Sequence, residues 1–109
     1  MSDLRFIEAE AGDELLLECR SKGTVTNYSA ALKKFVPGTS GVSDQTWNRA
    51  TLEGPGGHAV LENVPGYNLI IFPNLGGNGS IDAKLTLGKQ TDEMTISTNS
   101  SAGWRIFIF

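Results

Sequence analysis

The sequence predicts an all-β fold, an antiparallel β-sandwich of jelly-roll or immunoglobulin-like type with about eight or nine short strands. Thirteen glycines and four prolines are spread over the 109 residues and divide the chain into short apolar runs. Runs of about five to eight residues separated by turn-forming residues are typical of strands. Several runs also alternate apolar and polar residues, which is the pattern of a strand with one buried face.

The length of the chain fits one domain, so we expect residues 1–109 to form a single β-sandwich. A parallel sheet would need crossover connections, usually helices, between its strands. The chain has no room for them between its closely spaced turns. No internal repeat of fixed period is present, which disfavours a propeller.

Two strands are expected at the start of the chain, at residues 4–8 and 14–20. In the second strand Leu15, Leu17 and Cys19 share one face, because successive side chains of a strand point to opposite sides. We expect this face to be buried, with Cys19 pointing into the core.

The middle of the first half is less clearly patterned. Residues 30–36 fit either one helical turn or a strand. Residues 37–44 are predicted to form a loop, because they mix residues that fix, free or hydrogen-bond the backbone locally. Residues 46–52, which include Trp47, are interpreted as a return to a strand.

The second half contains the clearest strand patterns. The Pro65-Gly66 pair suits the middle of a type II turn and predicts a hairpin between the runs that flank it. The expected strands of this half are residues 58–62, 67–72, 80–87, 93–98 and 104–109.

Charge and composition disfavour several classes of function. The net charge of −3 and the isoelectric point near 5.0 leave no basic excess to neutralise phosphates, so we expect no nucleic-acid partner. The longest apolar run is the four residues 69–72, far short of the roughly twenty that a membrane helix needs, so no membrane partner is expected. The first residues lack the pattern of a secretory signal. We therefore expect a cytoplasmic protein, with a secreted form left open.

Catalytic and metal chemistry are poorly supported. His58 is the only histidine and Cys19 the only cysteine, so an intrachain disulfide and a zinc site of three or four such ligands are both excluded. We expect no catalytic residue, no metal and no cofactor. An enzyme that uses His58 or paired carboxylates stays open as a weaker alternative.

Aromatic and amide side chains near loops suggest a binding function. Sugar sites on β-domains commonly combine an aromatic ring with amide and carboxylate groups. The leading hypothesis is therefore a non-enzymatic, lectin-like module that binds glycan. The expected ligand-binding residues are Asp44, Gln45, Trp47, Asn48, Tyr67, Asn74 and Asn78. The alternative for Trp47 and Trp104 is that both fill the core.

The last strand is apolar on both faces, which favours a protein contact. Phe107 and Phe109 share one side of this strand, and we expect them at the interface of a homo-oligomer. A central strand buried on both sides would explain the pattern equally well. The alternative function is a protein-interaction domain, such as an inhibitor, an assembly subunit or a phage or defence accessory subunit, that uses this strand or the 37–45 loop.

Overall fold

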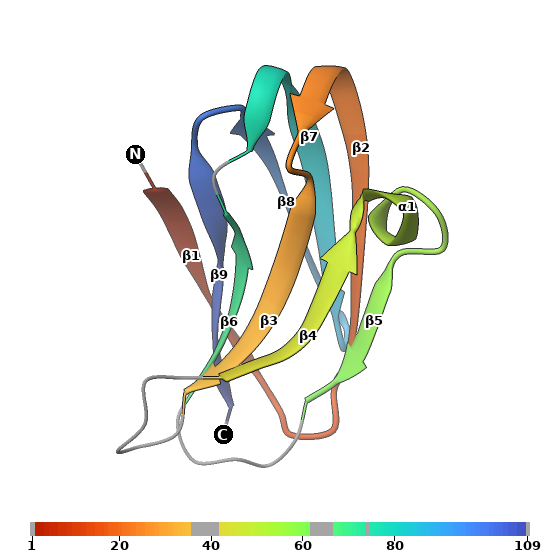
Figure 1. The fold of residues 1–109 in the computed structure, drawn as a ribbon. Coiled ribbons are helices and arrows are strands. Elements are labelled where there is room, and N and C mark those ends of the chain that lie inside the picture. Colours follow the sequence, from red (N-terminus) through yellow and green to blue (C-terminus); the bar gives the residue numbers. More distant parts are fainter. Residues whose placement is uncertain (1, 36–41, 62–66, 74, 109) are drawn as a thin grey trace.

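The computed structural model of the chain describes residues 2–35, 42–61, 67–73 and 75–108. Within these residues, nine strands form two packed sheets, and one short helix connects β4 to β5 (Figure 1). This confirms the predicted all-β sandwich. The elements are β1 (Ser2–Ala9), β2 (Glu14–Thr26), β3 (Ser29–Phe35), β4 (Val42–Asn48), α1 (Arg49–Leu52), β5 (Gly57–Val60), β6 (Tyr67–Phe72), β7 (Gly76–Leu87), β8 (Gln90–Ser97) and β9 (Ser101–Ile108).

The strands divide into a five-stranded sheet, in the order β1-β9-β6-β3-β4, and a four-stranded sheet, in the order β5-β2-β7-β8. One pair departs from the antiparallel prediction, because β1 runs parallel to β9. These two strands lie at opposite ends of the chain, so no tight turn forces them to be antiparallel. The other recorded pairs are antiparallel.

Residues 30–36 are resolved in favour of the strand, since β3 covers most of them. The strand predicted for residues 46–52 is wrong beyond Asn48, where the chain turns into α1. The Asn48 side chain ends the strand by capping the helix: its Oδ1 accepts a hydrogen bond from the Thr51 amide at 3.1 Å. An asparagine N-cap satisfies a backbone donor that a short helix leaves without a partner.

The predicted hairpin around Pro65-Gly66 is wrong. β5 pairs with β2 in the four-stranded sheet, whereas β6 pairs with β3 and β9 in the five-stranded sheet. Residues 62–66, which hold the expected turn, lie outside the described residues. Sequence neighbours were expected to pair, but alternation shows only which face of a strand is apolar and not which strand lies beside it.

The other predicted strands are found at their expected places as far as the described residues extend, although β2 continues to Thr26, well beyond the predicted end. The loop predicted for residues 37–44 is wrong from Val42 onward, because β4 begins there and pairs with β3. β7 and β8 form a hairpin through Gly88, whose φ of +59° is a left-handed conformation that favours glycine. β9 lies between β1 and β6, so it is an inner strand of its sheet and not an edge.

The core lies between the inner faces of the two sheets. Trp104 is fully buried and meets Phe72 edge-on, with ring centroids 6.5 Å apart. Trp47 is also buried, so both tryptophans fill the core, as the alternative expectation held. Cys19 lies on the same face of β2 as the buried Leu15 and Leu17 and packs against the core, although it is only partly buried.

Asp92 closes the sandwich on the side where β1 and β8 face each other. Its Oδ2 accepts a hydrogen bond from Trp104 Nε1 at 2.8 Å, and Arg5 Nη1 donates to its Oδ1 at 3.2 Å. Arg5 also donates to the Glu93 carbonyl at 2.6 Å. The Trp104 hydrogen bond and the Arg5 guanidinium hold the pKa of Asp92 below its usual range. Strands from both sheets are thereby joined through one carboxylate.

Trp47 and α1 close the opposite side, where β4 and β5 face each other (Figure 1). A Cβ built on Gly57 would come within 2.6 Å of the Trp47 ring, so only glycine lets β5 approach this closely. β5 pairs with β2 only as far as Leu17. Beyond that point Glu53, just after α1, accepts a hydrogen bond from the Ser21 amide at 2.8 Å and covers the strand edge.

Changing Asp92 to Ala should lower the free energy of unfolding by about 1–3 kcal/mol, because the buried Trp104 N–H would lose its acceptor. Asp92→Asn should cost less, since its amide oxygen can still accept that bond. Urea denaturation measures both values. Thr91→Ala, at an exposed neighbouring position, is the control. Equal stability of Asp92→Ala and wild type would contradict the role assigned to Asp92.

The same carboxylate makes stability depend on acid. Its pKa in the folded state is lower than in the unfolded chain, so the stabilisation is complete above the ordinary aspartate pKa of about 3.9. It is lost as pH falls from that value through the folded-state pKa. We expect wild type and Asp92→Asn to converge in stability over this acid range, as measured by denaturation at a series of pH values. A constant difference between them would contradict the assignment.

Gly57→Ala should destabilise the fold by about 1–3 kcal/mol, because the added methyl group overlaps the Trp47 ring. Thermal unfolding followed by circular dichroism tests this. Replacing Trp47 by Phe in the alanine variant removes part of the overlap and should reduce the loss. No recovery in the double variant would show that the two residues are not coupled.

Candidate functional site

The predicted ligand-binding residues do not come together in one place. Trp47 lies in the core, and the Asn48 side chain caps α1. Asn78 lies near the start of β7, opposite Thr24, at the other end of the sandwich from Gln45. Asn74 is outside the described residues, and so are the side chains of two residues placed in β4 and β6, namely Asp44 and Tyr67.

Other loop asparagines serve the backbone. Asn27 and Asn99 have φ values of 52° and 66°, a left-handed conformation that asparagine tolerates better than most residues. They form the turns between β2 and β3 and between β8 and β9. The asparagines at these two positions are therefore explained by the geometry of the turns and not by ligand binding.

An exposed apolar surface covers the outer face of the five-stranded sheet. Trp104, Ile106 and Ile70 point inward and are buried, so the residues that alternate with them point outward. We call this surface the outer apolar face and define it by Leu4, Phe6, Leu69, Ile71, Arg105 and Phe107. Phe109, also expected there, lies outside the described residues.

Two aromatic rings form the centre of the outer apolar face. Phe6 is 65% exposed and Phe107 is 41% exposed. Their rings are stacked, with centroids 5.6 Å apart and an interplanar angle of 16°. The guanidinium of Arg105 lies 5.6 Å from the centroid of the Phe6 ring, within reach of a cation–π interaction. This cluster joins β1 to β9 while leaving large aromatic surfaces in water.

The outer face of the four-stranded sheet is different, because it carries paired charges. Lys84 lies between Glu18 and Glu93 in the strand register. Asp82 forms an ion pair with Lys22 at 2.8 Å, and Thr95 donates a hydrogen bond to it, also at 2.8 Å. The Lys22 ammonium lowers the pKa of Asp82. Compensated cross-strand pairs of this kind suit a sheet face that remains in water.

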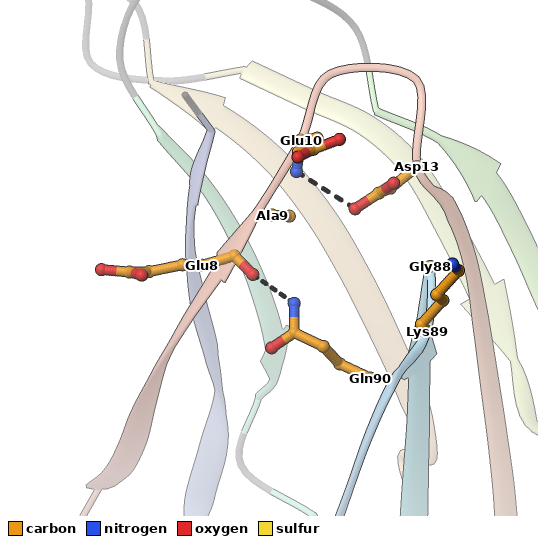
Figure 2. Close-up of a pocket in the computed structure, with 7 residues that line it drawn as sticks. All are labelled: Glu8, Ala9, Glu10, Asp13, Gly88, Lys89 and Gln90. Atoms are coloured by element: carbon orange, nitrogen blue, oxygen red, sulfur yellow. Dashed lines mark hydrogen bonds between the residues drawn. The ribbon is translucent and has the colours of Figure 1, made fainter.

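A hollow of about 580 Å³ lies at the turns where β1 meets β2 and β7 meets β8 (Figure 2). Its carboxylates do not converge: the Glu8 side chain points away, while Asp13 accepts a hydrogen bond from the Glu10 amide at 3.1 Å. Gln90 donates to the Glu8 carbonyl and ties β8 to β1. These two hydrogen bonds stabilise the turns at this end of the sandwich.

A cleft of about 420 Å³ opens between β3, β4 and β6 on one side and β5 on the other. Its apolar wall includes Leu32 and Leu61, and its polar groups come from Lys34, Gln45 and Asn68. Asn68 is only 3% exposed, and its Oδ1 has no hydrogen-bond partner. Gln45 is the one predicted ligand-binding residue whose described side chain lines this cleft.

His58 is exposed at the start of β5, where its Nε2 lies 3.2 Å from the Pro55 carbonyl oxygen. Within the described part of the chain, no three histidine, cysteine, aspartate or glutamate side chains gather to hold a metal. The described residues also contain no helix long and apolar enough to cross a membrane.

The thiol of Cys19 is a weak nucleophile in the folded protein. Burial raises the pKa of its thiol to about 12, an effect that outweighs the opposite influence of the neighbouring Tyr28 hydroxyl. A thiol needs its thiolate form to act as a nucleophile. Cys19 therefore acts as a small apolar residue packed against the core and not as a nucleophile.

Sequence reasoning missed two residues that the structure makes prominent. Asn68 shares its strand face with Ile70 and Phe72, so an amide interrupting an apolar face was a visible signal. Phe6 and Ile7 are adjacent in β1, so their side chains point to opposite faces of the sheet. Both are apolar, and the sequence therefore does not show which of them faces the core.

Comparison of the chain with family models, with curated proteins and with solved structures finds no match.

Alkylation of Cys19 in the folded protein at pH 8 should be roughly 10³-fold slower than in the unfolded chain. A pKa of about 12 in place of 9.0 lowers the thiolate fraction by about that factor. Reaction with iodoacetamide, followed by mass spectrometry with and without denaturant, measures the two rates. Rates within tenfold of each other would show that the thiol is accessible and ionises normally.

Proposed function

We propose that this chain is a non-enzymatic binding domain that associates with a second copy of itself through the outer apolar face. The observation that supports the proposal most strongly is the exposed stack of Phe6 and Phe107. Exposed apolar patches of this kind mark interaction sites in soluble domains. The outer face of the four-stranded sheet carries paired charges, and among the described residues its one exposed large apolar side chain is Val60.

The size of the outer apolar face fits the apolar centre of a dimer interface. The outer apolar face extends over three strands, β1, β6 and β9, which are six to eight residues long. At about 4.8 Å between strands and about 3.3 Å per residue, the face measures on the order of 300–400 Å² in projection. A standard protein interface buries roughly 800 Å² of accessible surface on each partner, and accessible surface exceeds projected area.

The charges around the stacked rings favour a copy of the same chain as partner. Glu8 lies opposite Phe107 in the strand register, and Arg105 lies opposite Phe6. The stack is thus flanked by one acidic and one basic side chain. A two-fold axis near the rings would bring Arg105 of each copy towards Glu8 of the other. Self-complementarity of this kind is what a symmetric dimer requires.

Phe107→Asp should give a folded monomer, whereas wild type should form a dimer. Burial of one Phe contributes about 1.5–3 kcal/mol, and each ring occurs twice in a symmetric interface. The dissociation constant should therefore rise by on the order of 10²-fold or more. Light scattering after gel filtration measures mass, and circular dichroism measures folding.

Val60→Asp is the matched control, because Val60 is 59% exposed on β5, away from the outer apolar face. It should leave the mass of the dimer unchanged. A monomeric wild type at high micromolar concentration would overturn the proposal. Unfolding of Phe107→Asp would also contradict it, because that outcome would assign Phe107 to the core.

A second candidate function is the glycan binding that the sequence predicts. It is favoured by one observation, the buried and unpaired Asn68 oxygen in the cleft that Gln45 also lines. The supporting residues differ from most of those expected, since Trp47 is in the core and Asn78 lies at the other end of the molecule. An array of immobilised glycans, probed with labelled wild type, tests this function directly.

A further inference from the structure

We propose that the cleft around Asn68 is a binding site for a hydroxylated ligand of monosaccharide size, an inference that rests on the second proposed function. Asn68 Oδ1 is a buried acceptor without a donor. An unpaired buried polar atom is destabilising, and native proteins contain few of them. The neighbouring inward residues of β6, Ile70 and Phe72, show that apolar side chains fit this face.

The surroundings of Asn68 define what can reach it. Along the five-stranded sheet, Asn68 lies between Lys34 of β3 and Ile106 of β9 in the strand register. Asn68 also lines the cleft, which has room for more than one water molecule, since a water occupies about 30 Å³. A molecule bound in the cleft would therefore lie beside Asn68 and could supply the missing donor.

The groups that line the cleft select a hydroxylated ligand. Asn68 Oδ1 needs a donor, whereas the Gln45 amide nitrogen donates to an acceptor. A hydroxyl group both donates and accepts, so a polyol can serve both groups. Leu32 and Leu61 form an apolar wall against which the C–H groups of a sugar ring can pack. The volume lies in the range of small-molecule sites.

Nuclear magnetic resonance of uniformly ¹⁵N-labelled wild type tests the site. The probes are glucose, galactose, N-acetylglucosamine and glucuronic acid, each added separately. At least one should move the side-chain amide signals of Asn68 and Gln45 saturably, with a millimolar dissociation constant. The side-chain amide of Asn78, at the other end of the sandwich, should not move.

Asn68→Leu is the decisive variant. It removes the unpaired oxygen, so its melting temperature should equal or exceed that of wild type, and binding should weaken at least tenfold. Gln45→Ala should weaken binding as well, while Asn78→Ala is the matched control and should not. A lower melting temperature of Asn68→Leu would overturn the proposal, because it would show that the amide already has its partners.

The remaining outcomes separate this site from the broader function. If the glycan array is positive but no probe moves the Asn68 signal, glycan binding stands and the cleft is not its site. If neither the array nor the four probes give binding, the glycan-binding function and the cleft as its site both fail. Movement of Asn68 that is linear and never saturates would also overturn the cleft as a site.

Discussion

The indole N–H of Trp104 imposes the constraint on which the rest of the sandwich depends. The ring is fully buried, so its donor needs an acceptor inside the protein. Asp92 supplies that acceptor from the other sheet, and its charge is in turn balanced by Arg5 of β1. Three strands are placed by this one requirement. With β1 paired along β9 at this edge of the five-stranded sheet, Arg5 lies within reach of Asp92.

The opposite side of the sandwich is closed by shape instead of charge. Trp47 packs against Gly57, where a single methyl group would already overlap its ring. β5 pairs with β2 only as far as Leu17 and does not reach Ser21. The Ser21 amide instead donates a hydrogen bond to Glu53, which follows α1, so the end of this helix takes the place of a strand there. A two-layer sheet protein must protect its edges from further pairing. Here the described residues use an ion pair at one edge and a helix at the other.

The two proposed binding surfaces follow from this frame. Because β1 is held against β9, Phe6 stacks on Phe107 and the pair is left facing outward. The cleft has a different origin: β5 lies close to β4 at Gly57, and Leu61, just after β5, lines the cleft together with Asn68 of β6. One surface is apolar and broad, as protein interfaces are at their centres, whereas the other is small and mixed, as ligand sites are.

The sequence by itself determined the class of fold, because glycine spacing and two-residue alternation are local properties that limit every element to a short strand. It also determined that Leu15 and Leu17 share a buried face. Tertiary structure decided what local patterns do not contain: that β5 and β6 belong to different sheets, that Trp47 is covered, and that Phe6 meets Phe107. Each of these depends on which strands become neighbours, and that choice is made by packing across the core between residues far apart in the chain.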